Sequence, residues 1–102
     1  MTRLLITGGT LLDQHGERAG DVAISDGRVV DVGEALPRAA GDTVLDAAGC
    51  IVSPGFVDLH VHLREPGKEE AETIETGSRA AALGGFTAVV AMPNTDPAQD
   101  SV

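Results

Sequence analysis

The first twenty residues alternate short apolar runs with glycine and polar residues. An apolar run at 4–6 is stopped by Gly8-Gly9, a second apolar pair follows at 11–12, and the segment 13–20 is polar. Apolar runs of this length bounded by glycine are typical of short strands. The pattern predicts two strands, or one bent strand, followed by a loop over 13–20.

A second group of short runs continues to residue 52. Asp26-Gly27 separates two β-rich runs and predicts a tight hairpin, because both turn residues must accept positive φ. A loop is expected over 34–42, a strand over 43–46, a turn over 47–49 and an apolar pair at 51–52. Together these runs predict a small set of antiparallel strands.

The pattern changes at Pro54. A strand over 55–62 leads into a Pro66-Gly67 turn, and residues 68–83 contain no proline and many helix formers. Gly84-Gly85 ends that helix, and a mostly apolar run over 86–92 has the length of a strand. Strand, helix and buried strand predict a βαβ unit with two parallel strands.

Composition narrows the class of protein. The 102 residues are 42% hydrophobic and 23% charged, which is ordinary for a globular protein, but they include only two aromatic residues, both Phe. A net charge of −9 argues against a nucleic-acid surface or an anionic membrane as partner. Cys50 is the only cysteine, and no apolar run approaches a membrane span, so we expect a cytoplasmic protein.

Candidate chemistry lies on the strand over 55–62. Asp58, His60 and His62 share one strand face, because successive side chains point to opposite sides. Two histidines at this spacing lie about 7 Å apart at Cβ, near enough to reach one cation. They would form part of a metal site, since a catalytic zinc takes three protein ligands and water.

The βαβ topology brings further polar residues to the same edge. His60, His62 and Arg64 leave the first strand where Asn94 and Thr95 leave the second, and ligands bind at that end of parallel sheets. Arg64 suggests recognition of a carboxylate or phosphate, although it could instead pair with one of the nearby acidic side chains, Glu65, Glu69 or Glu70. Asn94 could bind a ligand or simply form a turn.

Three other residues are weaker candidates. Asp58 could support the metal site or only fill the interior of the sheet. His15 lies in the predicted polar loop, far along the chain from the other histidines. Lys68, the only lysine, precedes the predicted helix and is expected to face solvent.

The length of the chain bears on its organisation. A parallel βαβ pair cannot bury both faces alone, and a full (β/α)₈ barrel needs about 250 residues. We therefore expect an N-terminal fragment of a larger α/β enzyme. Residues 1–52 would hold the antiparallel strands of one part, and residues 53–102 would hold the βαβ unit of another; that unit could belong to a barrel or to a doubly wound sheet.

The residues from Pro54 to His62, PGFVDLHVH, resemble the first-strand signature of the cyclic amidohydrolases. The extension LREPG at 63–67 and MPNT at 92–95 are specifically similar to the dihydroorotases. The resemblance spans essentially the whole chain, and it is generic over the first 50 residues. It implies a (β/α)₈ TIM barrel beside a small β-sandwich, which the N-terminal strands would begin.

The resemblance also implies a function. The full-length protein would be a zinc-dependent hydrolase of the cyclic amide C–N bond, interconverting L-dihydroorotate and N-carbamoyl-L-aspartate in pyrimidine biosynthesis. His60 and His62 would bind one or two zinc ions, and His62, Arg64 and Asn94 would bind substrate. The remaining ligands and the catalytic aspartate are expected after Val102, so the fragment alone should be inactive.

Relatives offer alternatives. Allantoinases resemble the chain but typically carry Asn at the position of Arg64, and dihydropyrimidinases and hydantoinases usually lack the Arg-Glu-Pro-Gly run. Some dihydroorotase-like chains have lost metal ligands and serve as non-catalytic partners of aspartate transcarbamoylase. The resemblance allows three kinds of partner: a small-molecule substrate, a second copy of the chain in a homodimer, and aspartate transcarbamoylase.

Overall fold

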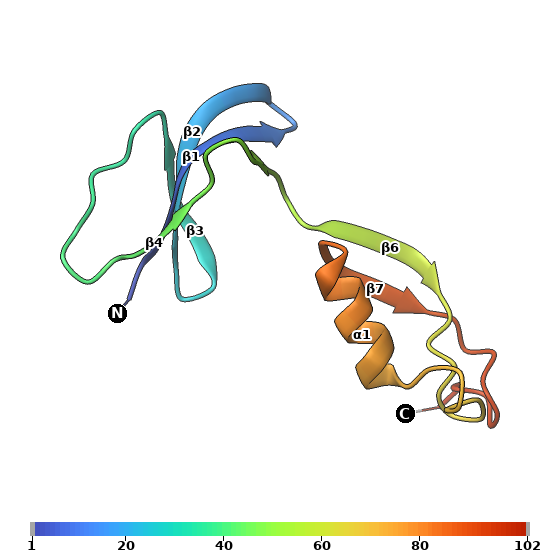
Figure 1. The fold of residues 1–102 in the computed structure, drawn as a ribbon. Coiled ribbons are helices and arrows are strands. Elements are labelled where there is room, and N and C mark those ends of the chain that lie inside the picture. The colour runs from blue at the N-terminus through green and yellow to red at the C-terminus, as the bar shows by residue number, and fades with distance from the viewer. Residues whose placement is uncertain (1, 102) are drawn as a thin grey trace. The chain divides into compact units, whose positions relative to one another are not determined.

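The computed structural model describes residues 2–101, which divide into two compact units between Pro54 and Gly55. The N-terminal unit contains the strands drawn in blue to green in Figure 1, and the C-terminal unit contains two strands and a helix drawn in yellow to red. Each unit has its own hydrogen-bonded sheet. No helix among the described residues has the length and apolar character needed to cross a membrane.

The N-terminal unit is a five-stranded sheet. Its strand order is β3-β2-β1-β4, and β5 also pairs with β1. The strands are β1 (Leu4–Asp13), β2 (Gly16–Ser25), β3 (Arg28–Gly33), β4 (Thr43–Asp46) and β5 (Ile51–Val52). β1, β2 and β3 pair antiparallel, whereas β4 and β5 both pair parallel with β1. The prediction of an antiparallel set was therefore wrong for these last two strands.

The first hairpin corrects another prediction. Residues 13–20 were expected to form a loop, but β2 begins at Gly16 and pairs back onto β1, with Asp13 opposite Gly16. Polar composition was misleading here because the side chains of 16–19 are exposed and need no apolar character. The Asp26-Gly27 hairpin is confirmed, with φ of 51° and 72° at its two turn residues.

β1 is one bent strand rather than two. Its pairing with β2 shifts register between Ile6 and Gly9, and Gly8 has φ of 72°. A Cβ at Gly9 would lie 2.6 Å from the Val52 side chain, so glycine at this position lets β1 approach β5 closely. The bend thus serves the packing of the unit around its buried residues Leu5, Leu11, Ala23 and Ala47.

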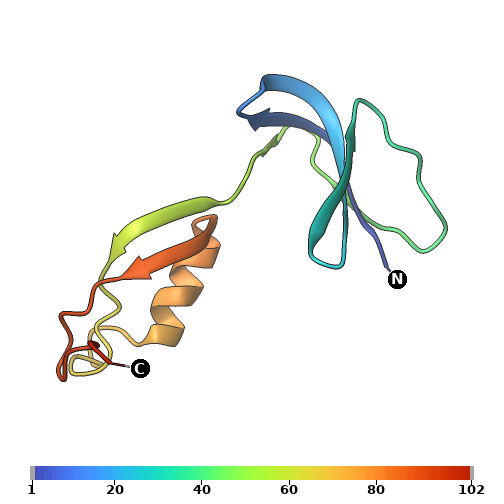
Figure 2. The same ribbon diagram turned by 180° about the vertical axis from the view of Figure 1, so that it is seen from behind.

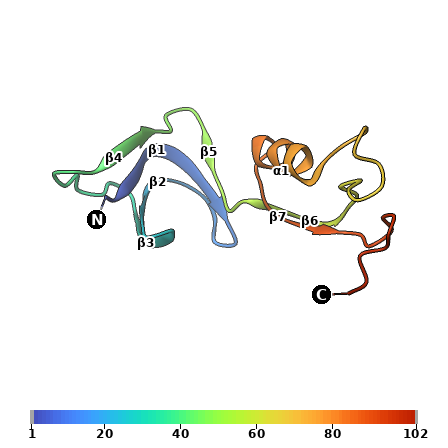
Figure 3. The ribbon, with the colours of Figure 1, turned by 90° about the horizontal axis from the view of Figure 1, so that it is seen from below.

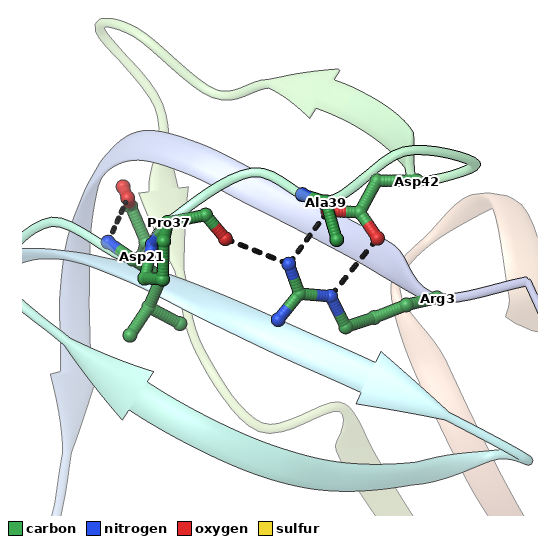
Figure 4. A network of polar contacts seen from close by, with 6 residues as sticks. Arg3, Asp21, Pro37, Ala39 and Asp42 are labelled. Atoms are coloured by element: carbon green, nitrogen blue, oxygen red, sulfur yellow. Dashed lines mark hydrogen bonds and ion pairs between the residues drawn. The ribbon is translucent and has the colours of Figure 1, made fainter.

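A polar network holds the long loop between β3 and β4 against the sheet (Figure 4). The Arg3 guanidinium donates to both oxygens of Asp42, at 3.0 and 2.6 Å, and to the Pro37 carbonyl at 2.7 Å. Asp42 also accepts from the Ala39 N–H, and Asp21 accepts from the N–H groups of Gly8 and Leu36. These bonds satisfy the N–H groups of Leu36 and Ala39 in the loop and of Gly8 at the bend of β1.

The C-terminal unit is the predicted parallel βαβ unit. It comprises β6 (Phe56–Val61), α1 (Ile74–Leu83) and β7 (Phe86–Ala91), and β6 and β7 pair parallel. Figure 3 shows α1 on one face of the strand pair. Both strands end on the same side, where the connections that follow them run next to each other (Figure 2).

The helix is shorter than predicted. It begins at Ile74 rather than Lys68, because Thr73 closes a capping box with Thr76: the Thr73 hydroxyl accepts from the Thr76 N–H, and the Thr76 hydroxyl accepts from the Thr73 N–H. The Glu65 carboxylate accepts a further bond, 2.6 Å long, from the Ile74 N–H. Residues 68–73 therefore belong to the loop after β6.

Candidate functional site

The site is built where the two parallel strands end. The Met92 N–H donates to the Val61 carbonyl at 2.8 Å, which continues the strand pairing one residue past β7. Beyond it, the Asp96 N–H donates to the Pro66 carbonyl at 3.0 Å. The two connections are therefore tied together by backbone bonds, and the side chains between these ties are held close.

A pocket of about 160 Å³ lies between the two connections. It lies entirely within the C-terminal unit, and its walls combine imidazole, guanidinium, amide and carboxylate groups with a few apolar side chains. The lining residues are His62, Leu63, Arg64, Pro66, Lys68, Met92, Asn94, Thr95 and Asp96. Three predicted substrate-binding residues, His62, Arg64 and Asn94, thus share one pocket.

His60 and His62 lie next to each other at the end of β6. Their ring centroids are 5.2 Å apart, with the rings inclined by 66°. His60, the second-to-last residue of β6, is exposed. His62, just past the strand, is half-buried and faces the pocket. Imidazole nitrogens are ligands that zinc prefers, so this pair is suited to supply two of its ligands. The described residues include no group of three or more histidine, cysteine or carboxylate side chains arranged to hold a metal.

His62 also contacts the second strand's connection. Its Nδ1 lies 2.9 Å from Oδ1 of Asn94, across 32 residues of sequence. The contact joins a predicted metal ligand to a predicted substrate-binding residue. It also shows that Asn94 is more than a turn former.

Arg64 has an unusual backbone conformation and, within residues 2–101, no acidic partner. Its φ is 66°, a left-handed conformation uncommon for residues other than glycine, and the Lys68 N–H donates to its carbonyl at 2.9 Å. Among the described residues Arg64 forms no ion pair.

Two of the three acidic side chains named as possible partners of Arg64 bind backbone groups. Glu65 accepts from the Ile74 N–H, and Glu69 accepts from the Gly67 N–H at 3.0 Å. The bond from Gly67 contributes most to lowering the pKa of Glu69. With these carboxylates engaged, the Arg64 guanidinium remains a wall of the pocket.

The three weaker candidates, Asp58, His15 and Lys68, lie in different surroundings. The Asp58 side chain bonds within its own strand: its Oδ1 accepts from the His60 N–H at 3.0 Å. His15 lies in the β1–β2 turn of the N-terminal unit, where its Nε2 is 3.2 Å from the Gln14 amide nitrogen. Lys68 is exposed, as expected, and it also lines the pocket, as does Asp96. The sequence pattern placed neither residue at this pocket, because it treated 68–83 as helix and 96–102 as the end of the pattern.

Comparisons with known proteins match the pocket and most of the rest of the chain. The model of the dihydro-orotase-like family matches residues 49–102, which include the whole pocket. A dihydroorotase of Shouchella clausii is 57% identical over 99 residues, covering 94% of this chain and 22% of its own length. One from Bacillus subtilis is 51% identical over 98 residues, covering 95% and 23%. The chain thus spans less than a quarter of these relatives.

Solved structures show the same architecture. An L-hydantoinase (dihydropyrimidinase) from Arthrobacter aurescens matches with a TM-score of 0.82 and 30% identity, over 96% of this chain and 22% of that one. A D-hydantoinase from Bacillus sp. AR9 matches with a TM-score of 0.77 and 39% identity, over 94% and 21%. The mixed α/β fold is therefore confirmed, and on the family match over more than half of its residues this chain belongs to the dihydroorotase-like family.

Proposed function

We propose that these residues are part of a dihydroorotase that hydrolyses and re-forms the cyclic amide of L-dihydroorotate. The observation that carries the proposal is the Arg64 guanidinium, unpaired among the described residues, in one pocket with His62 and Asn94. Arginine binds carboxylates through two parallel hydrogen bonds, and dihydroorotate carries a carboxylate beside its ring. The identity of more than 50% to several dihydroorotases supports the same substrate.

The reaction assigns separate tasks to the pocket residues. Water adds to the ring amide carbonyl, the C–N bond breaks, and the ring nitrogen takes a proton to give N-carbamoyl-L-aspartate. Arg64 and the Asn94 amide would hold the substrate carboxylate, which fixes the ring relative to His60 and His62. Holding the reacting amide in one orientation lowers the entropic part of the barrier.

His60 and His62 would bind zinc, and further ligands would come from outside these 102 residues. Bound zinc supplies a Lewis acid that polarises the amide carbonyl and lowers the pKa of water. Because the ligand set and the catalytic acid–base group are incomplete here, we expect no turnover from these residues alone. We further propose that they begin a (β/α)₈ barrel of a cytoplasmic enzyme of pyrimidine biosynthesis.

A second candidate is a hydantoinase- or dihydropyrimidinase-type hydrolase, which the solved structural neighbours favour. Such substrates have the same cyclic amide without the carboxylate, so they would leave Arg64 without a partner. A substrate carboxylate would give this guanidinium a bidentate partner, and the lack of one makes this candidate the weaker. A non-catalytic dihydroorotase-like protein is a third, and intact His60, His62 and Arg64 argue against it.

The direct test uses the full-length protein that contains these residues. Zinc content is measured by elemental analysis, and hydrolysis of dihydroorotate is followed spectroscopically. Stoichiometric zinc with turnover is the expected result. A full-length protein that binds no zinc and shows no turnover would belong with the non-catalytic relatives, and this result would refute the proposal.

A further inference from the structure

We propose that Asn94 is a positioning residue for His62: its Oδ1 keeps the imidazole proton on Nδ1 and thereby leaves Nε2 as the nitrogen that binds metal. This inference rests on the proposed function for the metal itself. It starts from the distance of 2.9 Å between His62 Nδ1 and Asn94 Oδ1. No other hydrogen bond to either side chain occurs among the described residues.

With Asn94 Oδ1 facing the ring nitrogen, the direction of the bond follows from the chemistry of the two groups. A carboxamide oxygen only accepts, so the imidazole nitrogen facing it must carry a hydrogen. A neutral imidazole has one N–H, so a proton held on Nδ1 leaves the Nε2 lone pair open. A histidine must be neutral and present a lone pair to bind zinc, and a partner on the other nitrogen sets which one is presented.

The fold makes this contact reproducible rather than incidental. β6 and β7 are in parallel register with Val61 opposite Ala91, and the Met92 N–H donates to the Val61 carbonyl. These backbone bonds lie one and two residues from the two side chains. His62 and Asn94 are therefore held by the strand ends and not by their own side-chain contact alone.

The same amide can serve the pocket. With Oδ1 used by His62, the Asn94 NH₂ group has two donors left, and Asn94 lines the pocket beside Arg64. One carboxamide would thus present its acceptor to the metal ligand and its donors to the substrate carboxylate. Loss of Asn94 should accordingly affect zinc affinity as well as substrate binding, whereas a residue that contacts substrate alone would affect only the second.

The test reads the tautomer of His62 directly. Metal-free full-length protein labelled with ¹⁵N-histidine is examined by long-range ¹H–¹⁵N NMR, with the His62 signals assigned by their loss in His62→Gln. We expect the proton on Nδ1 in the wild type and in Asn94→Asp, which keeps an acceptor, and a shift of the proton toward Nε2 in Asn94→Ala. Thr95→Val is the matched control, because Thr95 lines the same pocket but its hydroxyl donates to the Pro97 carbonyl.

Zinc affinity, measured by competition with a chromophoric chelator, provides the second readout. Asn94→Ala should bind zinc about 10- to 100-fold more weakly, the usual cost of losing such a partner, and Thr95→Val should bind as the wild type does. An Nε2–H tautomer in the wild type, or unchanged tautomer and affinity in Asn94→Ala, would overturn the inference. A wild type that binds no zinc would instead contradict the proposed function, and the metal-free tautomer would still decide the role of Asn94.

Discussion

At the residue scale, the arginines of this chain differ in their surroundings. Arg3, Arg18 and Arg79 each pair with a carboxylate, whereas Arg28, Arg38 and Arg64 form no ion pair among residues 2–101. Of these three unpaired arginines, Arg64 is the one that lines the pocket with His62 and Asn94. Arg64 also adopts the left-handed conformation that most side chains avoid. A charged side chain held in such a conformation beside a pocket is better explained by a ligand than by stability.

Replacing Arg64 should separate substrate binding from metal binding. In the full-length enzyme, Arg64→Ala should lower kcat/KM for dihydroorotate roughly 10- to 150-fold, because hydrogen bonds to a charged group contribute about 1.5–3 kcal/mol. Zinc content should be unchanged. Arg79→Ala is the matched control, since its ion pair with Glu75 lies on the exposed helix surface; equal kinetics for the two variants would remove Arg64 from the site.

At the scale of elements, the pocket depends on how α1 begins. The loop over 62–73 carries His62 and Arg64, and it ends at the capping box of Thr73 and Thr76. Glu65, also in this loop, accepts from the first helical N–H, at Ile74. Gly77, the one buried residue of the described C-terminal unit, lets the Leu63 side chain pack against the helix, because a Cβ there would lie 2.7 Å from Leu63 Cδ2. The helix start therefore positions the pocket wall.

Loss of the helix cap should lower the stability of the protein by a measurable amount. Thr73→Ala removes the acceptor for the Thr76 N–H and should lower the free energy of unfolding by about 1 kcal/mol. Thr73→Ser keeps the acceptor and should recover most of it. Denaturant unfolding of the full-length protein compares the two; equal destabilisation by alanine and serine would show that the cap contributes little.

Sequence and structure agree to different extents in the two units. The βαβ unit and the grouping of His62, Arg64 and Asn94 followed from apolar runs and strand-end topology, since parallel strands must open on one side. The start of β2 and the parallel pairing of β4 and β5 could not be predicted. Exposed strand residues carry no apolar signal, and pairing partners far apart in sequence leave none in a local pattern. The helix start was misplaced because 68–73 contains good helix formers that the Thr73 cap excludes.

At the scale of the whole molecule, much apolar surface is left uncovered. Phe56, Val57 and Leu59 of β6 are 56%, 57% and 71% exposed, although they belong to a strand pair of the kind usually buried on both faces. The buried apolar side chains of the described residues lie in the N-terminal unit. This distribution is consistent with the proposal that the βαβ unit belongs to a larger barrel.

The carboxylates of the N-terminal unit should make its stability depend on pH. The Arg3 guanidinium, with the Ala39 N–H, lowers the pKa of Asp42 to about 2, and Arg18, with the His15 N–H, lowers that of Asp13 to about 2. Since an unfolded aspartate titrates near 3.9, the folded state binds fewer protons between these values. The stabilisation is fully present above about pH 4 and is lost as the pH falls toward 2.

A charge-matched pair of variants tests this linkage. Asp42→Asn should lower the denaturation midpoint at pH 7 and reduce its further fall between pH 4 and pH 2. Glu34→Gln removes the same charge from the same loop, and Glu34 makes no side-chain hydrogen bond among the described residues, so its pH profile should follow the wild type. Parallel profiles for Asp42→Asn and the wild type would show that the Arg3–Asp42 pair does not contribute.

The proposed function requires this pocket to select a cyclic amide bearing a carboxylate. The most direct measurement is the ratio of kcat/KM for dihydroorotate to that for dihydrouracil, the same ring without the carboxylate, on the full-length enzyme. Contacts from Arg64 and Asn94 to the carboxylate predict a preference for dihydroorotate of roughly 100-fold or more. Equal turnover of the two substrates, or a preference for dihydrouracil, would contradict the account.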